Sequence, residues 1–284
     1  MTTLDLKPMT TAELLDRTFF LYRKYFPLFV GIAVTPALVI FLAEVLYSSY
    51  GASKMANATS GAGIISIVPM LTLAMLIYVA VILFVNAIAQ GAAIAAVSDV
   101  YLERSSSIGK AFAGLRGKIL SIIFATILMY FIVLIGAIFL IVPGIIFLTA
   151  FVLTVPAIVI ENLTPVAALG RSWDLTKGSR LRVLAVYVIL LVLTYVVSIV
   201  FAIPGLIMTG ISGLKDPTSV SMLARILSAT GTFFAACLAT PLGAIAFSLL
   251  YYDQRARKEG FDLQFMLASL ESKESPMTQS EKEP

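Results

Sequence analysis

The sequence predicts an all-α integral membrane protein with six transmembrane helices, arranged as three hairpin repeats with short cytoplasmic amphipathic interfacial helices. Hydrophobic residues make up 60% of the 284 residues and charged residues only 13%, whereas soluble domains average about 45–50% apolar and about 25% charged residues. Long uncharged stretches can supply the spans, since about 20 apolar residues cross a bilayer. The composition therefore excludes a soluble protein.

The first 25 residues predict an amphipathic interfacial helix and not a cleavable signal peptide. Thr10 and Glu13 have the spacing of a capping box. Apolar side chains then recur at helical spacing, at Leu15, Phe19, Tyr22 and Phe26. We therefore divide the chain into this segment at 1–25, a transmembrane domain at 26–260, and a C-terminal amphipathic helix with a disordered tail at 261–284.

The first two spans form the first predicted hairpin. The first span is expected from about Pro27 to Tyr47, followed by a small-residue loop at 48–63. The second is expected as one long helix over 64–98, because the charge-free stretch is too short for two spans and a turn. A weaker interfacial segment follows at 99–118.

The later spans are marked by Pro-Gly pairs, which break helices. Residues 119–160 carry no charge and predict a tight hairpin that turns at Pro143-Gly144. The fifth span is expected over 183–209, ending near Pro204-Gly205, with a loop at 210–221. The sixth span is expected over 226–252, with a kink at Pro241.

Lysine and arginine concentrate on one predicted side of the membrane. All but three of the 20 lie in the N-terminal segment, the 99–118 segment, the central segment or the C-terminal tail. The exceptions are Lys54, Lys215 and Arg225. Because cytoplasmic loops are enriched in these residues, we expect a bacterial inner-membrane protein with both termini in the cytoplasm.

A weak internal repeat predicts three units of interfacial helix plus hairpin. Residues 10–17 align without gaps on residues 164–171. LIVPGIIFL at 140–148 is echoed by FAIPGLIMT at 201–209 and more faintly by VTPALVIFL at 34–42. We expect the three units to lie side by side in one orientation.

The central polar segment, residues 161–182, predicts a short amphipathic helix at the membrane surface. Thr164 followed by Pro165 is typical of a helix start, and Gly178 is typical of a helix end. Its apolar residues recur on one helix face, at Val166, Leu169 and Trp173.

Histidine is absent from the sequence, which removes the commonest general base and the commonest zinc ligand. The lone cysteine, Cys237, permits no intramolecular disulfide. We therefore expect a protein that is not an enzyme and holds no metal or cofactor. A membrane-embedded lipid enzyme would have to use Glu161 or Asp253, and is the weakest alternative.

Three stretches stand in order along the chain: LLDRTFFLYRKYF at 14–26, ENLTPVAALGRSWDLTKG at 161–178 and LYYDQRARKEGFDL at 250–263. Together they resemble the bacterial glycerophosphoryl diester phosphodiesterase membrane domain family. The resemblance implies the membrane region that other proteins fuse to a phosphodiesterase barrel. Such a barrel needs about 250 further residues and works with histidines and metal-binding carboxylates. The resemblance therefore implies the membrane region without the phosphodiesterase activity.

Charged residues of the later polar segments are expected to converge at the cytoplasmic surface. The candidate site comprises Glu161, Arg171, Trp173, Asp174, Lys177, Asp253, Arg255 and Arg257. One interpretation is a site for an anionic headgroup or phosphodiester, bound by Arg171, Lys177 and Arg257. The other is a structural ion-pair cluster that fixes the interfacial helices to the bundle.

Polar residues inside the spans leave a transport interpretation open. The Pro-Gly pairs would mark discontinuous helices in a transporter. Asn86 and Gln90 share one helix face, where with Tyr195 they would line a polar pathway or hydrogen-bond to other helices. Glu44 would pair with Arg225 or reach interfacial water.

The leading hypothesis is a non-enzymatic membrane protein that organises lipid or a partner protein at its cytoplasmic face. Anionic inner-leaflet lipid is the expected partner, with a membrane or cytoplasmic protein as a further one. The alternative is a transporter or lipid-translocating protein that uses the repeat interface. No nucleic-acid partner is expected, because the basic residues are spread over four segments without interleaved aromatic residues.

Overall fold

The computed structural model describes residues 9–56, 61–102, 104–215 and 221–259, which form ten helices and no strand. The predicted C-terminal amphipathic helix and tail at 261–284 lie outside these residues. The helices are α1 (Thr11–Lys24), α2 (Phe26–Ala56), α3 (Gly61–Tyr101), α4 (Ile108–Ala113), α5 (Ile119–Phe139), α6 (Ile141–Phe151), α7 (Thr154–Glu161), α8 (Pro165–Thr176), α9 (Arg180–Lys215) and α10 (Met222–Glu259).

Within the described residues, six helical segments are long and apolar enough to cross a membrane, which confirms the predicted all-α, six-span class. The segments are Phe26–Lys54, Ile65–Tyr101, Ile119–Phe139, Ile141–Glu161, Arg180–Ile211 and Met222–Glu259. The single long helix α3 also confirms that the second charge-free stretch is one span. The protein is therefore a multi-pass membrane protein.

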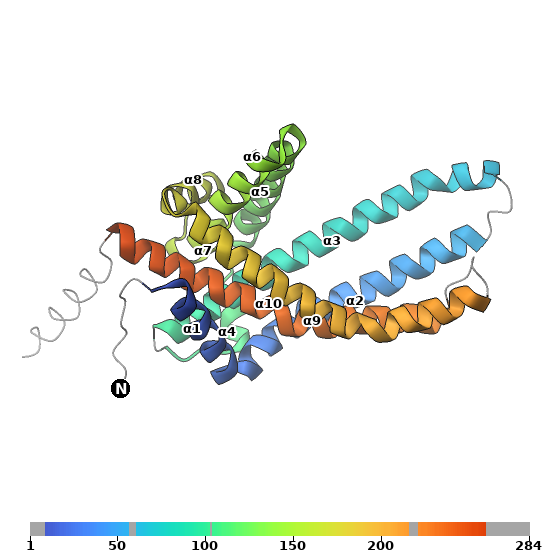
Figure 1. Cartoon of the computed structure of the whole chain (residues 1–284), viewed down its shortest axis with the longest axis horizontal. Helices are drawn as coiled ribbons and strands as arrows, with labels where there is room; N and C mark the ends of the chain where they lie inside the picture. The colour runs from blue at the N-terminus through green and yellow to red at the C-terminus, as the bar shows by residue number, and fades with distance from the viewer. Residues whose placement is uncertain (1–8, 57–60, 103, 216–220, 260–284) are drawn as a thin grey trace, which may run out of the picture.

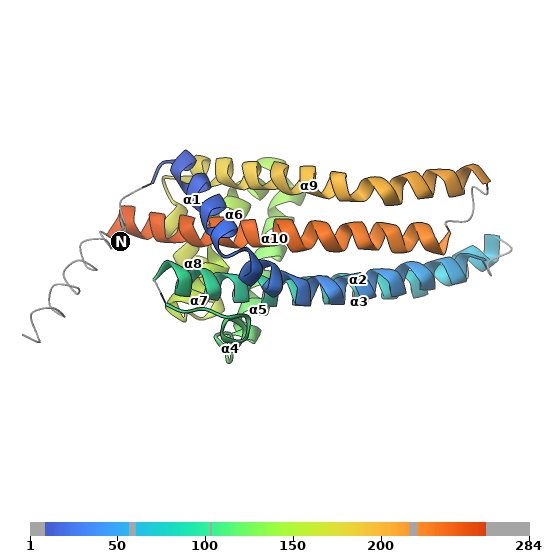
Figure 2. The same ribbon diagram turned by 90° about the horizontal axis from the view of Figure 1, so that it is seen from below.

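The spans pack as three hairpins, α2 on α3, α5 on α6 and α9 on α10 (Figure 1). A short helix precedes each hairpin, namely α1, α4 and α8. Helix α10 lies between α9 and the α2–α3 pair (Figure 2). The equivalence of the three units as repeats stays a prediction, and their helix starts differ. The Thr10 side chain caps α1, whereas Thr164 makes no side-chain cap at α8.

Helix α10 is the centre of the buried core. Its C-terminal half contains Ile245, Leu249 and Tyr251, which are fully buried. Leu14 of α1 and Ile158 of α7 belong to the same cluster. By contrast, many large apolar side chains of α3, α5 and α9 are exposed, as expected where lipid is the solvent. Dense packing is therefore concentrated at one end of the bundle.

Two loops are shorter than the sequence predicts. Helix α2 continues to Ala56 and α9 continues to Lys215, so the expected loops at 48–63 and 210–221 begin too early. In α2 the hydroxyls of Ser48 and Ser53 donate to carbonyls three residues before them, at 3.1 and 2.8 Å. Such bonds satisfy small polar side chains within a helix, so their presence did not require a loop.

The Pro-Gly pairs do not form the predicted turns. The chain turns at Leu140, and Pro143 lies in the first turn of α6, where its missing N–H removes no intrahelical bond. A Cβ on Gly144 would lie 3.0 Å from the Ala137 backbone, and one on Gly205 would lie 2.7 Å from Ser228 of α10. Both glycines therefore permit close helix packing, and the prediction of a break at 204–205 was wrong.

A helix break that the sequence analysis missed lies between α6 and α7. The Ser172 hydroxyl donates to the Ala150 carbonyl at 2.7 Å and accepts the Leu153 N–H at 3.2 Å. Thr176 also donates to the Ala150 carbonyl, at 3.3 Å. Unpaired backbone groups cost several kcal/mol each in a membrane, so these α8 side chains stabilise the break and fix α8 against the bundle.

Candidate functional site

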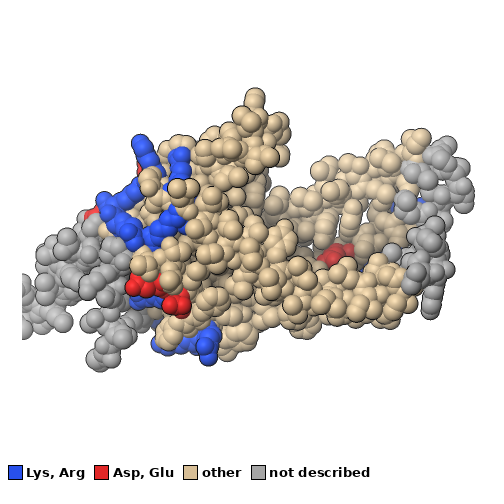
Figure 3. Space-filling view, viewed as in Figure 1, with Lys and Arg blue, Asp and Glu red and all other residues tan. Residues whose placement is uncertain are grey.

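The basic side chains gather at one end of the bundle, called here the charged end (Figure 3). Helices α1, α4 and α8 lie at this end, together with the C-terminal part of α10 (Figure 1). The predicted site residues lie there too, but they fall into separate groups with different chemistry.

Four residues of α7, α8 and α10 form a closed ion-pair quartet, defined as Glu161, Arg171, Arg255 and Glu259. Arg171 donates to Glu161 from Nε, at 3.0 and 3.3 Å, and from Nη2 at 2.9 Å, and its Nη1 pairs with Glu259. Arg255 Nε lies 3.2 Å from a carboxylate oxygen of each acid. Hydrogen bonding to Glu259 and then Glu161 raises the pKa of Arg171. The quartet is therefore internally neutralised.

A second group, the Asp253 clamp, joins the segment before α1 to α9 and α10. The Asp253 side chain is fully buried, and its Oδ2 accepts Arg182 Nη1 at 2.6 Å and Arg257 Nε at 3.0 Å. Its Oδ1 accepts the Met9 N–H at 2.7 Å. Both arginines also donate to the Met9 carbonyl, at 2.5 Å. The clamp therefore uses its charges to hold the Met9 backbone.

The remaining predicted residues do not join these groups. Trp173 contacts Phe151 at 5.8 Å between ring centroids, and the Arg180 guanidinium stacks 4.1 Å above the indole. Asp174 and Lys177 are exposed, and their backbone carbonyls accept hydrogen bonds from Lys258. The Lys258 ammonium thus satisfies carbonyls at the C-terminal end of α8.

The sequence analysis missed three members of the two groups, namely Glu259, Arg182 and Met9. The i, i+4 spacing of Arg255 with Glu259 was a local signal for one of them. Arg182 and Met9 reach Asp253 across 71 and 244 residues of sequence, so no local pattern indicated their contact.

A third group lines an open pocket between α1, the start of α2 and the end of α3, with a volume of about 610 Å³. We call it the basic pocket. Arg17, Lys24 and Arg104 supply its charged lining, and no acidic residue lines it among those described. Arg17 stacks on Tyr101 at 5.2 Å, and Lys24 lies 5.3 Å from the Tyr25 ring. None of the three cations forms an ion pair within the described part of the chain.

Hydroxyl and apolar groups complete the basic pocket. Ser105 and Ser106 line it, and the buried Ser106 hydroxyl oxygen has no hydrogen-bond partner among the described residues. Leu28 of α2 and Val100 of α3 supply apolar surface where those spans begin and end. The pocket can therefore accept an anionic group beside an apolar chain. These residues were not among the predicted site residues.

Local sequence positions the α1 side of the basic pocket. Thr10 and Glu13 form the predicted capping box, in which the Thr10 N–H donates to the Glu13 carboxylate at 2.6 Å. Buried Leu14, Thr18 and Leu21 fix one face of α1 against the bundle. Arg17 and Lys24 each follow a buried leucine by three residues, so they lie beside this face. Phe19 and Phe26 of the predicted apolar face are each 40% exposed.

Near α7 a single lysine has a structural task. The Lys118 ammonium donates to the Val159 carbonyl at 2.9 Å, close to the C-terminal end of α7. Burial lowers the pKa of Lys118, because it disfavours the charged form. Within the described ranges no group of three or more Asp, Glu or Cys side chains is placed to hold a metal ion.

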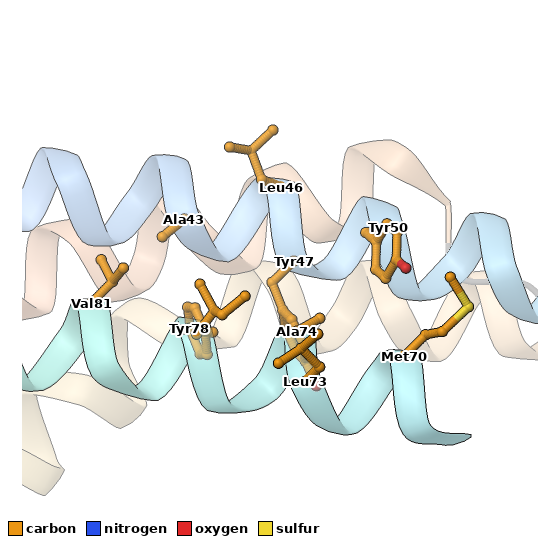
Figure 4. A pocket seen from close by; sticks show the side chains of 10 residues that line it. Ala43, Leu46, Tyr47, Tyr50, Met70, Leu73, Ala74, Tyr78 and Val81 are labelled. Atoms are coloured by element: carbon orange, nitrogen blue, oxygen red, sulfur yellow. The ribbon is translucent and has the colours of Figure 1, made fainter. Parts of the chain in front are cut away.

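Cavities also occur along the spans. Side chains of α2 and α3 line an apolar pocket of about 480 Å³ (Figure 4). Tyr47 and Tyr78 stack there at 4.9 Å between ring centroids. Nearer the charged end, Asn86 and Gln90 line a cavity of about 290 Å³. Tyr195 lines another of about 270 Å³.

Comparison with known proteins matches the chain to a protein family. A family model described as "Domain of unknown function (DUF7847)" matches residues 85–240, which are more than half of the chain. No curated protein and no solved structure matches the chain. The resemblance to the glycerophosphoryl diester phosphodiesterase membrane domain stays a prediction, since the matching family carries no assigned function.

Proposed function

Because the chain belongs to this DUF7847 family of unknown function, we propose its function from the geometry of the charged end. The protein is a non-enzymatic, multi-pass protein of the bacterial inner membrane, with the charged end in the cytoplasm. It binds the headgroup of an anionic lipid in the basic pocket and so organises lipid at its cytoplasmic face.

The observation that carries this proposal is the charge imbalance of the basic pocket. Arg17, Lys24 and Arg104 line it without a paired carboxylate among the described residues. A phosphate attracts such cations and accepts their hydrogen bonds. Anionic inner-leaflet lipids favour basic residues near the surface by about 1 kcal/mol per residue.

The quartet and the Asp253 clamp support a different role. Their guanidinium groups already donate to Glu161, Glu259, Asp253 or the Met9 carbonyl. Binding a headgroup there would have to displace these partners. We therefore assign Arg171, Arg255 and Arg257 to structure and shift the binding role to α1 and the end of α3.

The position of the basic pocket suits a lipid better than a soluble anion. Leu28 and Val100 continue directly into the spans α2 and α3, so a headgroup held by the cations would have apolar surface beside it for its acyl chains. Aromatic rings such as Tyr25 and Tyr101 are typical of the membrane–water interface.

The test is lipid binding by native mass spectrometry of the purified protein in mild detergent, with added dioleoylphosphatidylglycerol or dioleoylphosphatidylcholine. We expect the wild type to retain the phosphatidylglycerol in preference. The Arg17→Gln/Lys24→Gln/Arg104→Gln variant should lose this preference, and Lys24→Gln/Arg104→Gln, which changes two exposed side chains, should weaken it.

The matched control is Arg23→Gln/Arg116→Gln, which removes two exposed cations that do not line the basic pocket. It should bind phosphatidylglycerol as the wild type does. Equal retention of both lipids by the wild type, or an equal loss in the control, would contradict the proposal. Binding of soluble glycerol phosphate as strong as that of the lipid would assign the pocket to a soluble anion.

A further inference from the structure

Two cavities inside the spans adjoin each other at α10. The first is lined by α3, α5 and α10, and the second by α9 and α10. Gly243 and Phe247 of α10 line both of them. With volumes of about 290 and 270 Å³, each lies near the lower end of ligand pockets, which run from about 300 to 1,000 Å³. Together they suit one small polar group.

The cavities lie at membrane depth. Thr126 is seven residues into α5, which places it about 10 Å along the helix at 1.5 Å per residue. Asn86 and Thr240 lie 13 residues from Asp99 and Asp253, or about 20 Å along α3 and α10. The hydrocarbon core is about 30 Å thick, so these polar groups lie well inside it.

Three polar side chains of the first cavity have no hydrogen-bond partner among the described residues. Thr126 is 7% exposed, and its hydroxyl has no hydrogen bond among the described residues. The side chains of Gln90 and Thr240 form none in this part of the chain either. Asn86 donates to the Ile82 carbonyl at 2.9 Å, which leaves its amide oxygen available.

Hydroxyls elsewhere in the spanning helices behave differently. Thr149, Thr209, Thr230 and Ser248 each donate to a carbonyl four residues before them, at 2.7 to 3.0 Å. This is the usual way in which a membrane helix satisfies a hydroxyl. Thr126, Thr240 and Thr194 could form the same bond and do not, so their hydrogen-bonding capacity remains free within the cavities.

The lining selects the chemistry of an occupant. Among the residues that the structure describes, no charged side chain lines either cavity, and the polar groups are amides and hydroxyls, which both donate and accept. A charged headgroup would be unfavourable there, because it would lie in the membrane without a counter-ion. An uncharged head that carries a hydroxyl and ester oxygens would pair with these side chains.

The cavities are reachable from the lipid. Tyr130 is 48% exposed and Tyr195 is 62% exposed, and they line the first and the second cavity respectively. The α5–α6 hairpin diverges from the long helices on this side (Figure 1). Phe131 of α5 and Val192 of α9 present further exposed apolar surface, along which acyl chains can lie.

From these observations we propose that the two cavities form one binding site for the uncharged, hydroxyl-bearing head of a membrane glycerolipid. The head hydrogen-bonds with Asn86, Gln90, Thr126 and Thr240, and the acyl chains remain in the bilayer. This site is separate from the basic pocket and takes a different class of lipid.

The experiment is native mass spectrometry with 1,2-dioleoylglycerol as the probe. A Cβ on Gly243 would meet only a Phe247 ring carbon, at 3.9 Å. Gly243→Leu therefore directs a side chain into the shared space of both cavities. We expect it to weaken dioleoylglycerol binding at least tenfold, and Gln90→Leu to weaken it several-fold. If the leucine variant does not fold, Gly243→Ala replaces it in the binding experiment, because the added methyl group fits there without strain.

The matched controls are Thr209→Val and Gly210→Leu, which change a back-bonded threonine and an open glycine outside the cavities. Both should bind dioleoylglycerol as the wild type does. The proposal is overturned if the wild type does not bind dioleoylglycerol, or if folded Gly243 and Gln90 variants bind it unchanged. The cavity variants should retain dioleoylphosphatidylglycerol and the basic-pocket variants should retain dioleoylglycerol, so that either proposal can fail alone.

Discussion

The basic residues of the charged end divide into two regions that are similar in composition. In one region the cations are paired with carboxylates, and in the other they are not paired with any carboxylate among the described residues. In the quartet and the Asp253 clamp, each arginine lies against a carboxylate, and the Asp253 side chain is fully buried. In the basic pocket, Arg17 and Lys24 lie against aromatic rings, and Arg104 lines the pocket together with Ser105 and Ser106. The number of arginines near a membrane surface therefore does not identify a binding site. Their partners do.

The difference has an energetic basis. A buried charge is costly unless it is paired and hydrogen-bonded, so the cations around Asp253 are committed to the fold. Exposed cations keep much of their hydration and contribute little to stability. Lys24 and Arg104 of the basic pocket are exposed and consequently free to bind a ligand without loss of structure, whereas the half-buried Arg17 also donates to the Met9 sulfur at 3.9 Å.

The largest effect is expected from Asp253→Ala. Removing one partner of a buried pair destabilises by about 3–5 kcal/mol, because Arg182 and Arg257 would be left without their carboxylate. Unfolding in mixed micelles with increasing sodium dodecyl sulfate measures the free energy. A change below about 1 kcal/mol, which is typical of exposed pairs, would show that the clamp does not belong with buried pairs.

A smaller effect is expected at the quartet, where the side chains are 17–29% exposed. A double-mutant cycle of Glu161→Gln and Arg171→Gln should give a coupling energy of about 1 kcal/mol, within the range for contacting residues. The same unfolding assay measures it. Zero coupling would mean that Arg171 is energetically independent of Glu161 and as free as the basic-pocket cations.

For the basic pocket the expected stability change is smaller still. Arg104→Gln should alter the free energy of unfolding by no more than about 0.5 kcal/mol, as is usual for surface substitutions. Raising the salt concentration from about 0.1 M to about 1 M should weaken phosphatidylglycerol binding to the wild type, because the Debye length falls from about 10 Å to about 3 Å. Salt-independent binding, measured by flotation with vesicles, would contradict an electrostatic site.

The smallest effect concerns the helix that carries Arg17 and Lys24. Hydrogen bonds from the Thr10 backbone and then its hydroxyl lower the pKa of Glu13 from 4.5. The folded pKa is therefore below the unfolded one, so the stabilisation is present above about pH 4.5 and is lost as the pH falls through the folded pKa. Glu13→Gln should remove this pH dependence, measured by unfolding at pH 6 and pH 3. An identical pH profile in both proteins would contradict it.

Structural features that depend on neighbouring residues in the sequence were predicted correctly, whereas those that depend on contacts between distant residues were not. Hydropathy predicted six spans, and the single long span expected over 64–98 was confirmed as helix α3. The Thr10–Glu13 box and the stop at Gly178, with φ of +85°, also follow local rules and were confirmed. These features depend on residues a few positions apart.

The errors came from residues whose role depends on distant neighbours. Gly144 and Gly205 predicted breaks, because the helices that pack against them are not visible in the sequence. The break beside Leu153 was missed, because Ser172 stabilises it from another helix. At the candidate site, eight residues were expected to converge, yet which cations are paired depends on three-dimensional contacts such as that of Met9 with Asp253.

The Met9 contact has a consequence for biosynthesis. Its carbonyl accepts a hydrogen bond from Arg257, 248 residues later in the sequence. This hydrogen bond therefore cannot form until nearly the whole transmembrane domain has left the ribosome. At about 5–20 residues per second, about 12 to 50 s separate the synthesis of the two partners. During that interval α1 lacks its final anchor. A chain that stalls before α10 therefore lacks Asp253 and Arg257, the two residues through which α10 holds the Met9 backbone.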